Sequence, residues 1–134
     1  MNSLKGHIAE ITVNGSMSLV TLTLGEAITL KSIVIDTPQT APYLQEGVEL
    51  NLLFKETEVV IANDDIPGIS MQNQIPATIS NIEMGVLLSR LVLQSAAGII
   101  VAVAAAEAIR KMQLKEGDKV IALIKLNEII LSEC

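Results

Sequence analysis

An internal repeat is the feature that most limits how this chain can fold. The stretch LQEGVELNLLFKETEVVIA (44–62) matches LKEGDKVIALIKLNEIILS (114–132) in its Glu-Gly pair, its alternating apolar residues and its central lysine. The matched lysines, Lys55 and Lys125, are 70 positions apart. A second match, between LKGHIAEI from Leu4 and IPATISNI from Ile75, has an offset of 71. The chain is therefore predicted to contain two units of about 65 residues each, the size of small single-core domains.

The predicted domains are residues 1–66 and 67–134, joined by a linker over 62–74 that is rich in Asp, Pro and Gly. Half of the residues are hydrophobic, but Tyr43 and Phe54 are the only aromatic ones. The cores must therefore be aliphatic. Units this small are expected to bury further apolar surface against each other and against other copies, so we expect a homo-oligomer.

Apolar and polar residues alternate along much of the chain, which is typical of strands with one buried face. In LVTLTL (19–24), Val20, Leu22 and Leu24 are expected on one face. The pair Asn14-Gly15 predicts a hairpin turn before this strand. Further strands are expected around Ile8–Val13, which opens the first unit, and over 28–35, 48–54 and 59–61, with the last one closing the unit. Each unit then has five short strands.

A different segment separates the third and fourth strands of each unit. In the second unit, AAAEAIRKMQL (104–114) is rich in good helix formers and predicts a short helix. In the first unit, Pro38 and Pro42 limit the corresponding segment (37–45) to a turn. This order is typical of an OB-like barrel. The predicted fold class is all-β with short helices, arranged as two tandem OB-like five-stranded barrels.

Composition argues against several classes of function. The net charge is −6 and there is no basic stripe with interleaved aromatic residues, so we expect no nucleic-acid binding. With one histidine, His7, no histidine metal cage or Ser-His-Asp set can form, and no Gly-rich phosphate loop is present. We therefore expect that the protein is not an enzyme.

The sequence also indicates a compartment. The longest apolar run, around residues 96–106, is too short to span a bilayer, and the N-terminus has no long apolar signal segment. The single cysteine, Cys134, cannot form an intramolecular disulfide and suits a reducing environment. A cytoplasmic protein without membrane association is expected.

Two motifs resemble the Mop family, also called the molybdate-binding TOBE-type domain. ISMQNQIPATI (69–79) is similar to that family's opening Ser-Ala-Arg-Asn-Gln-Leu-Pro-Gly-like motif, with Ser70, Asn73, Gln74 and Pro76 matching. LKEGDKVIALIK (114–125) is similar to its Leu-Lys-x-Gly-Asp-Lys-Val-x-Ala-Leu-Ile-Lys signature, and EGVELNLLFK (46–55) is a drifted copy. The resemblance covers nearly the whole chain, including the duplication.

This resemblance implies a cytoplasmic, non-enzymatic oligomer that binds molybdate or tungstate at subunit interfaces, for molybdenum storage, buffering or homeostasis. It implies oxoanion-binding roles for Ser70, Gln72, Asn73 and Lys125, with Lys55, Asn2 and Ser3 as the first-unit counterparts. No organic cofactor and no metal cation are implied. A doubly charged tetrahedral oxoanion requires several N–H and O–H donors and one or two cations, which such residues can supply.

Some residues depart from the family pattern. Gln72 stands where the motif has an arginine, which replaces a charged donor by a neutral amide. Hydroxyl residues that the family often has 20 and 17 positions before the lysine are Ala105 and Ala108 here. Backbone amides and lysines would then hold more of the ligand, or some sites have been lost.

Three alternatives follow. The lysines can be solvated strand ends, and Ser70 and Asn73 can serve hydrogen bonding within the linker. The chain can be a non-binding oligomeric interaction module that kept the Mop scaffold. An oligonucleotide-binding OB fold is opposed by the acidic charge and the missing aromatic residues.

We expect a trimer, because three tandem chains provide the six barrels that six single-domain chains would. The sequence does not distinguish molybdate from tungstate.

Overall fold

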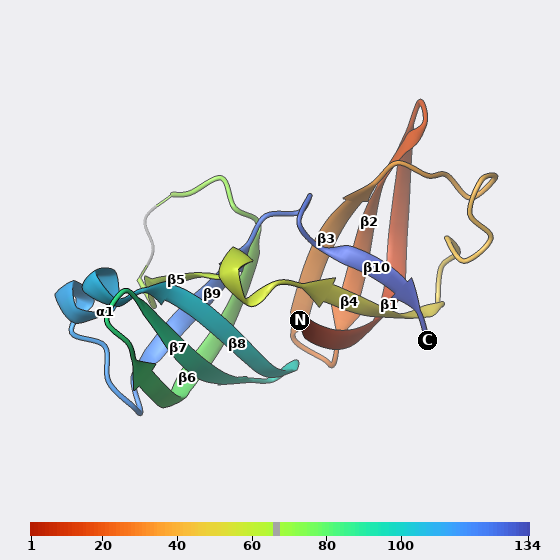
Figure 1. Cartoon of the computed structure of the whole chain (residues 1–134). Helices are drawn as coiled ribbons and strands as arrows, with labels where there is room; N and C mark the ends of the chain where they lie inside the picture. The colour runs from red at the N-terminus through yellow and green to blue at the C-terminus, as the bar shows by residue number, and fades with distance from the viewer. Residues whose placement is uncertain (66–67) are drawn as a thin grey trace.

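The computed structural model describes residues 1–65 and 68–134, which form two five-stranded antiparallel sheets (Figure 1). The sheet orders are β10-β4-β1-β2-β3 and β5-β9-β6-β7-β8. The two tandem OB-like barrels predicted from the repeat are therefore confirmed as the fold class. In chain order the elements are β1 (Asn2–Asn14), β2 (Met17–Leu24), β3 (Ile28–Val34), β4 (Glu49–Phe54), η1 (Glu56–Glu58), β5 (Val60–Asn63), β6 (Asn73–Met84), β7 (Leu88–Ser95), β8 (Gly98–Ala105), α1 (Ala106–Met112), β9 (Lys119–Ile124) and β10 (Ile130–Glu133).

The first strand of each unit carries the same irregularity at the same place. In β1 the register with β2 shifts between Ile8 and Glu10, and in β6 the register with β7 shifts between Ile79 and Asn81. Before the shift alternate side chains are buried, and after it the strand leaves the core. A bulge bends a strand in this way and lets it serve two parts of a curved sheet. The repeat seen in the sequence is thus also a repeat of backbone geometry.

The hairpin and the helix lie close to their predicted positions. Gly15 has a φ of 65° in the turn between β1 and β2, and Val20, Leu22 and Leu24 are all buried on one face of β2. The helix begins at Ala106 rather than at 104, because Ala104 and Ala105 continue β8. The corresponding segment of the first unit, 37–45, contains turns and no helix, as its two prolines predict.

The fifth strands do not lie where the sequence predicts, because each sheet takes this strand from the other half of the chain. Residues 59–61 were expected to close the first unit, but β5 pairs with β9 in the second sheet (Val60 opposite Leu123). The first sheet is completed by β10, which pairs with β4 (Ile130 opposite Leu53). The expectation for 59–61 is therefore wrong in its partner.

The link between β4 and β5 carries the chain from the first sheet to the second. It contains the short turn η1, which is flanked by Lys55 and Val59, both in extended conformation. The ribbon accordingly runs from β4 in one barrel through η1 to β5 in the other (Figure 1). The predicted domain boundary at 66/67 lies outside the described residues and stays a prediction.

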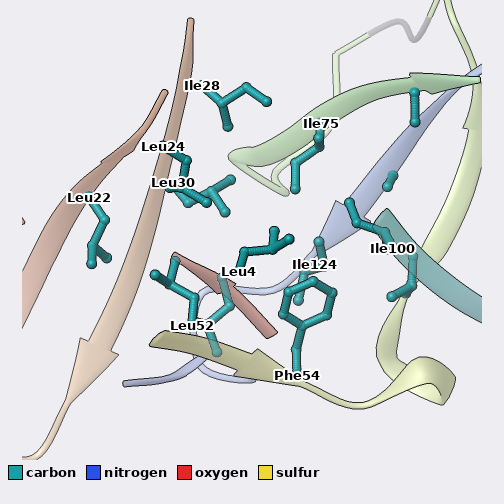
Figure 2. Packing of buried hydrophobic residues seen from close by; sticks show 14 of the residues in the cluster. Leu4, Leu22, Leu24, Ile28, Leu30, Leu52, Phe54, Ile75, Ile100 and Ile124 are labelled. Carbon is teal, nitrogen blue, oxygen red and sulfur yellow. The ribbon is translucent and has the colours of Figure 1, made fainter. Parts of the chain in front are cut away.

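The hydrophobic core is aliphatic and continuous across both sheets, as expected from the composition. Phe54 is fully buried and is the only phenylalanine. Figure 2 shows Leu4, Leu52 and Phe54 of the first sheet near Ile124 and Ile100 of the second. Burial of this kind contributes roughly 25 cal/mol per Å² of apolar surface, so the apolar contacts between the two units add to the stability of both.

Candidate functional site

A small pocket of about 190 Å³ lies where β6 begins and β9 ends. These two strands are antiparallel neighbours, with Asn73 opposite Ile124. The residues just before one strand and just after the other are therefore adjacent in space. The pocket is lined by Ser70, Met71, Gln72, Lys125, Leu126 and Asn127. Three residues predicted for the oxoanion site, Ser70, Gln72 and Lys125, thus line one pocket.

The pocket offers hydrogen-bond donors and positive charge. Lys125 is exposed, and within the described residues its ammonium group forms no ion pair. The Ser70 hydroxyl and the Gln72 and Asn127 amides are neutral donors, and no carboxylate is among the lining residues. An anion placed here would meet one cation and no lining residue of like charge.

Leu126 and Asn127 were not predicted as site residues. They follow Lys125 in a turn in which the Glu128 N–H donates to the Lys125 carbonyl at 3.0 Å. Asn127 lies inside the repeated block but stands where the first unit has Thr57, so the repeat itself gives no signal for this donor.

The residues of the first unit that correspond to the Lys125 turn carry a different charge. Glu56 follows Lys55 where Leu126 follows Lys125. The Met1 ammonium lies 2.6 Å from the Glu56 carboxylate. Hydrogen bonding to this ammonium, together with a backbone hydrogen bond, lowers the pKa of Glu56. A carboxylate that stays ionised next to Lys55 opposes the binding of a second anion.

Asn73 and Asn2 have partners that sequence reasoning missed. The Lys31 N–H donates to Asn73 Oδ1 at 2.7 Å, and Asn73 Nδ2 donates to the Lys31 carbonyl at 2.8 Å. Asn2 makes the same pair of bonds to the Val101 backbone, both at 2.8 Å. Both asparagines are buried, and neither lines the pocket. Ser3 is exposed on β1, opposite Leu53.

A larger groove, of about 640 Å³, is lined by residues of β6, β7 and β9. Its charged residues are Lys119 and Asp64, so their charges cancel and the groove favours an anion less than the Lys125 pocket does. Among the described residues, no group of three or more His, Cys, Asp or Glu side chains is arranged to hold a metal ion. None of the helices in the described part of the chain has the length and apolar character needed to cross a bilayer.

The second half of the chain matches one protein family when it is compared with known proteins. Residues 69–131 match the model of the TOBE domain. The fold is similar to that of the cytoplasmic molybdate-binding protein ModG in a form with molybdate bound: the TM-score is 0.91 and the identity 24%, over 99% of this chain and 96% of that one.

Two shorter proteins match fewer than half of the residues. A molybdate-binding protein from Sporomusa ovata is 30% identical over 44% of this chain and 88% of its own, with a TM-score of 0.43. MopII from Clostridium pasteurianum is 25% identical over 43% and 88%, with a TM-score of 0.41. No match was found among curated protein sequences.

Proposed function

We propose, from the premise that this chain belongs to the TOBE-domain (Mop) family, that it binds molybdate or the similar oxoanion tungstate in the pocket around Lys125. The observation that carries the proposal is the composition of this pocket. Lys125, with the side chains of Ser70, Gln72 and Asn127, provides one cation and three neutral donors with no carboxylate among them. A tetrahedral dianion is stabilised by such charge-assisted hydrogen bonds. The molybdate-bound form of ModG, which has the same fold, adds support.

The proposal includes a homo-oligomer, for which we favour a trimer, with sites completed at subunit interfaces. One lysine and three neutral donors do not neutralise a dianion with four oxygens, so a neighbouring copy would provide the remaining donors. Several large apolar side chains are also exposed: Val86 at 88%, Leu87 at 80% and Ile35 at 78%. Exposed apolar surface of this kind is typical of protein interfaces.

The physiological role that we propose is storage, buffering or homeostasis of molybdenum in the cytoplasm, without enzymatic activity. ModG, which shares the tandem fold, is described as cytoplasmic and molybdate-binding. In a binding protein of this kind the ligand would be released unchanged, so the pocket needs donors and a cation but no nucleophile or general base.

A second candidate function is a non-binding interaction module built on the same scaffold. Gln72 replaces a charged donor, and Ala105 and Ala108 provide no hydroxyl groups. This alternative predicts an oligomer with no affinity for molybdate or tungstate.

Isothermal titration with molybdate and with tungstate, using sulfate as the control anion, tests the proposal. We expect saturable heat with at least one of the two anions that sulfate does not reproduce. Ligand at 100 times its Kd should stabilise the folded protein by about 2.7 kcal/mol. Lys125→Ala should abolish the heat, while Lys119→Ala, which removes a lysine from the other end of β9, should retain it. No heat and no thermal stabilisation with any of the anions would favour the interaction module.

A further inference from the structure

Two buried asparagines hold the two barrels together in the same way. Asn73, the first residue of β6, bonds both backbone groups of Lys31 in β3, the edge strand of the first sheet. Asn2, the first residue of β1, does the same to Val101 in β8, the edge strand of the second sheet. Each barrel thus uses the start of its first strand to bind the edge of the other.

An asparagine amide is well suited to this contact because it has one acceptor and one donor, like a residue of a neighbouring strand. The side chain therefore continues the sheet edge for one residue. Asn73 is 1% exposed, so the backbone groups of Lys31 would lose their partner without gaining full access to water. An aspartate of the same shape keeps the acceptor but cannot donate to the Lys31 carbonyl.

The two contacts differ in what adjoins them. Asn73 follows directly on the segment Ser70–Gln72 that lines the pocket, and it lies opposite Ile124, which directly precedes Lys125. The bonds to Lys31 therefore fix the point from which both pocket segments leave the sheet. Asn2 lies opposite Phe54, at the other end of the interface, where Lys55 and Glu56 follow.

We propose that Asn73 is a positioning residue for the oxoanion pocket: it anchors both pocket segments to the first barrel without contacting the ligand. This inference rests on the proposed function. A ligand of fixed tetrahedral shape needs its donors held in one arrangement, and donors on a loosened segment lose affinity through the ordering that binding then requires. The orientation of the two barrels thereby becomes a determinant of ligand affinity.

The test uses Asn73→Asp and Asn2→Asp, each in a Lys55→Ala chain so that the Lys125 pocket alone is titrated with molybdate. Both substitutions remove the same donor from equivalent contacts, so both should lower Tm. Because Asn73→Asp also adds a carboxylate next to the pocket, which by itself opposes an anion, the comparison of Lys31→Pro with Lys31→Ala, which carry the same charge, decides between lost positioning and repulsion. We expect Asn73→Asp to weaken molybdate binding at least fivefold at a temperature where all variants are folded. Asn2→Asp should stay within twofold of the parent chain.

A second variant approaches the same contact from the other barrel. Lys31→Pro removes the backbone N–H that donates a hydrogen bond to Asn73, which lies 42 residues away in sequence. Lys31→Ala is its control, because alanine keeps this N–H. The proline variant should weaken molybdate binding, and the alanine variant should not. This pair answers the question if Asn73→Asp does not fold.

The outcomes separate the two proposals. No molybdate binding by the Lys55→Ala parent and by the unsubstituted chain overturns the proposed function together with this inference. If the parent chain binds molybdate, and Asn73→Asp and Lys31→Pro both keep an affinity within twofold of the parent, the positioning role alone is overturned. Equal losses of affinity in Asn73→Asp and Asn2→Asp overturn it as well, because the effect would then come from general loosening of the interface.

Discussion

At the scale of single residues, equivalent positions of the repeat have different surroundings. Lys55 and Lys125 both follow the fourth strand of their unit, but Glu56 comes after the first and Leu126 after the second. The Glu56 carboxylate is engaged by the Met1 ammonium. The two halves of the chain therefore repeat the same backbone, but the residue after the lysine is acidic in the first half and apolar in the second.

Tyr43 provides a residue-scale prediction, since it is the only tyrosine. Its pKa is raised above 10.0, first by burial and then by the charges of Asp36 and Glu133. A raised pKa means that the neutral phenol contributes stability below the ordinary value, and that this contribution is lost as pH rises through the folded-state pKa. Glu133 is in β10, so it acts on Tyr43 because of the strand exchange.

The measurement is a pH titration of phenolate absorbance in the near ultraviolet. We expect a midpoint above 10.0, and a lower midpoint in Glu133→Gln. Glu128→Gln should not move it, since Glu128 does not contribute to the shift. An unchanged midpoint in Glu133→Gln would contradict the contribution of Glu133 to this shift.

The resemblance to the Mop motifs predicted three of the six residues that line the pocket, Ser70, Gln72 and Lys125, but not what Asn73 does. The proximity of these three residues depends on the pairing of β6 with β9, which the alternation of apolar residues alone does not specify. The partner of Asn73 is a backbone 42 residues away in the other sheet. Every residue other than proline has the backbone groups that Asn73 binds, so the type of the partner residue does not reveal the contact and no sequence pattern indicates it.

At the scale of elements, the bulged first strand and the turn before the fourth strand are interlocked. The Gly117 N–H donates to the Ile79 carbonyl at 2.8 Å, and the Gly47 N–H donates to the Ile8 carbonyl at 2.7 Å. These glycines have φ values of 93° and 84°. A left-handed residue is needed here to aim the N–H at the bulge, which explains the glycine in both copies of the repeat.

Gly117→Ala should therefore destabilise the protein by about 1–2 kcal/mol through backbone strain. An added Cβ would meet nothing within 4 Å, so steric clash does not contribute. Denaturant unfolding measures the effect. Glu116→Ala, at the exposed position before Gly117, is the control and should change stability little. Equal effects at the two positions would contradict the strain argument.

At the scale of the whole molecule, the exchange of fifth strands joins the two halves. The sequence could predict ten strands but not this exchange, because residues 59–61 and 129–131 are both short apolar segments that can pair with β4 or β9. The choice depends on the direction in which the chain leaves η1, which local propensity does not specify.

Because of the exchange, we expect a core substitution beside a fifth strand to loosen mainly the sheet of the other half of the chain. Ile129 and Val59 are repeat counterparts and both are buried, and the Ile129 carbonyl accepts a hydrogen bond from Ser32 in β3. Ile129→Ala should cost about 2–5 kcal/mol and increase hydrogen exchange most in β3 and β4. Val59→Ala should increase it most in β8 and β9. Hydrogen-exchange mass spectrometry distinguishes this from the opposite pattern, in which each substitution loosens the sheet of its own half.

The position of β10 also affects how the protein is made. During synthesis the N-terminal half leaves the ribosome first, and most proteins complete their domains in that order. Here the outer edge of β4 stays unpaired until residues 130–133 have been added. An open edge of this kind invites pairing with other nascent chains. The first barrel therefore cannot be finished before residues 130–133 of the second half have been made, and the two halves reach their final form together.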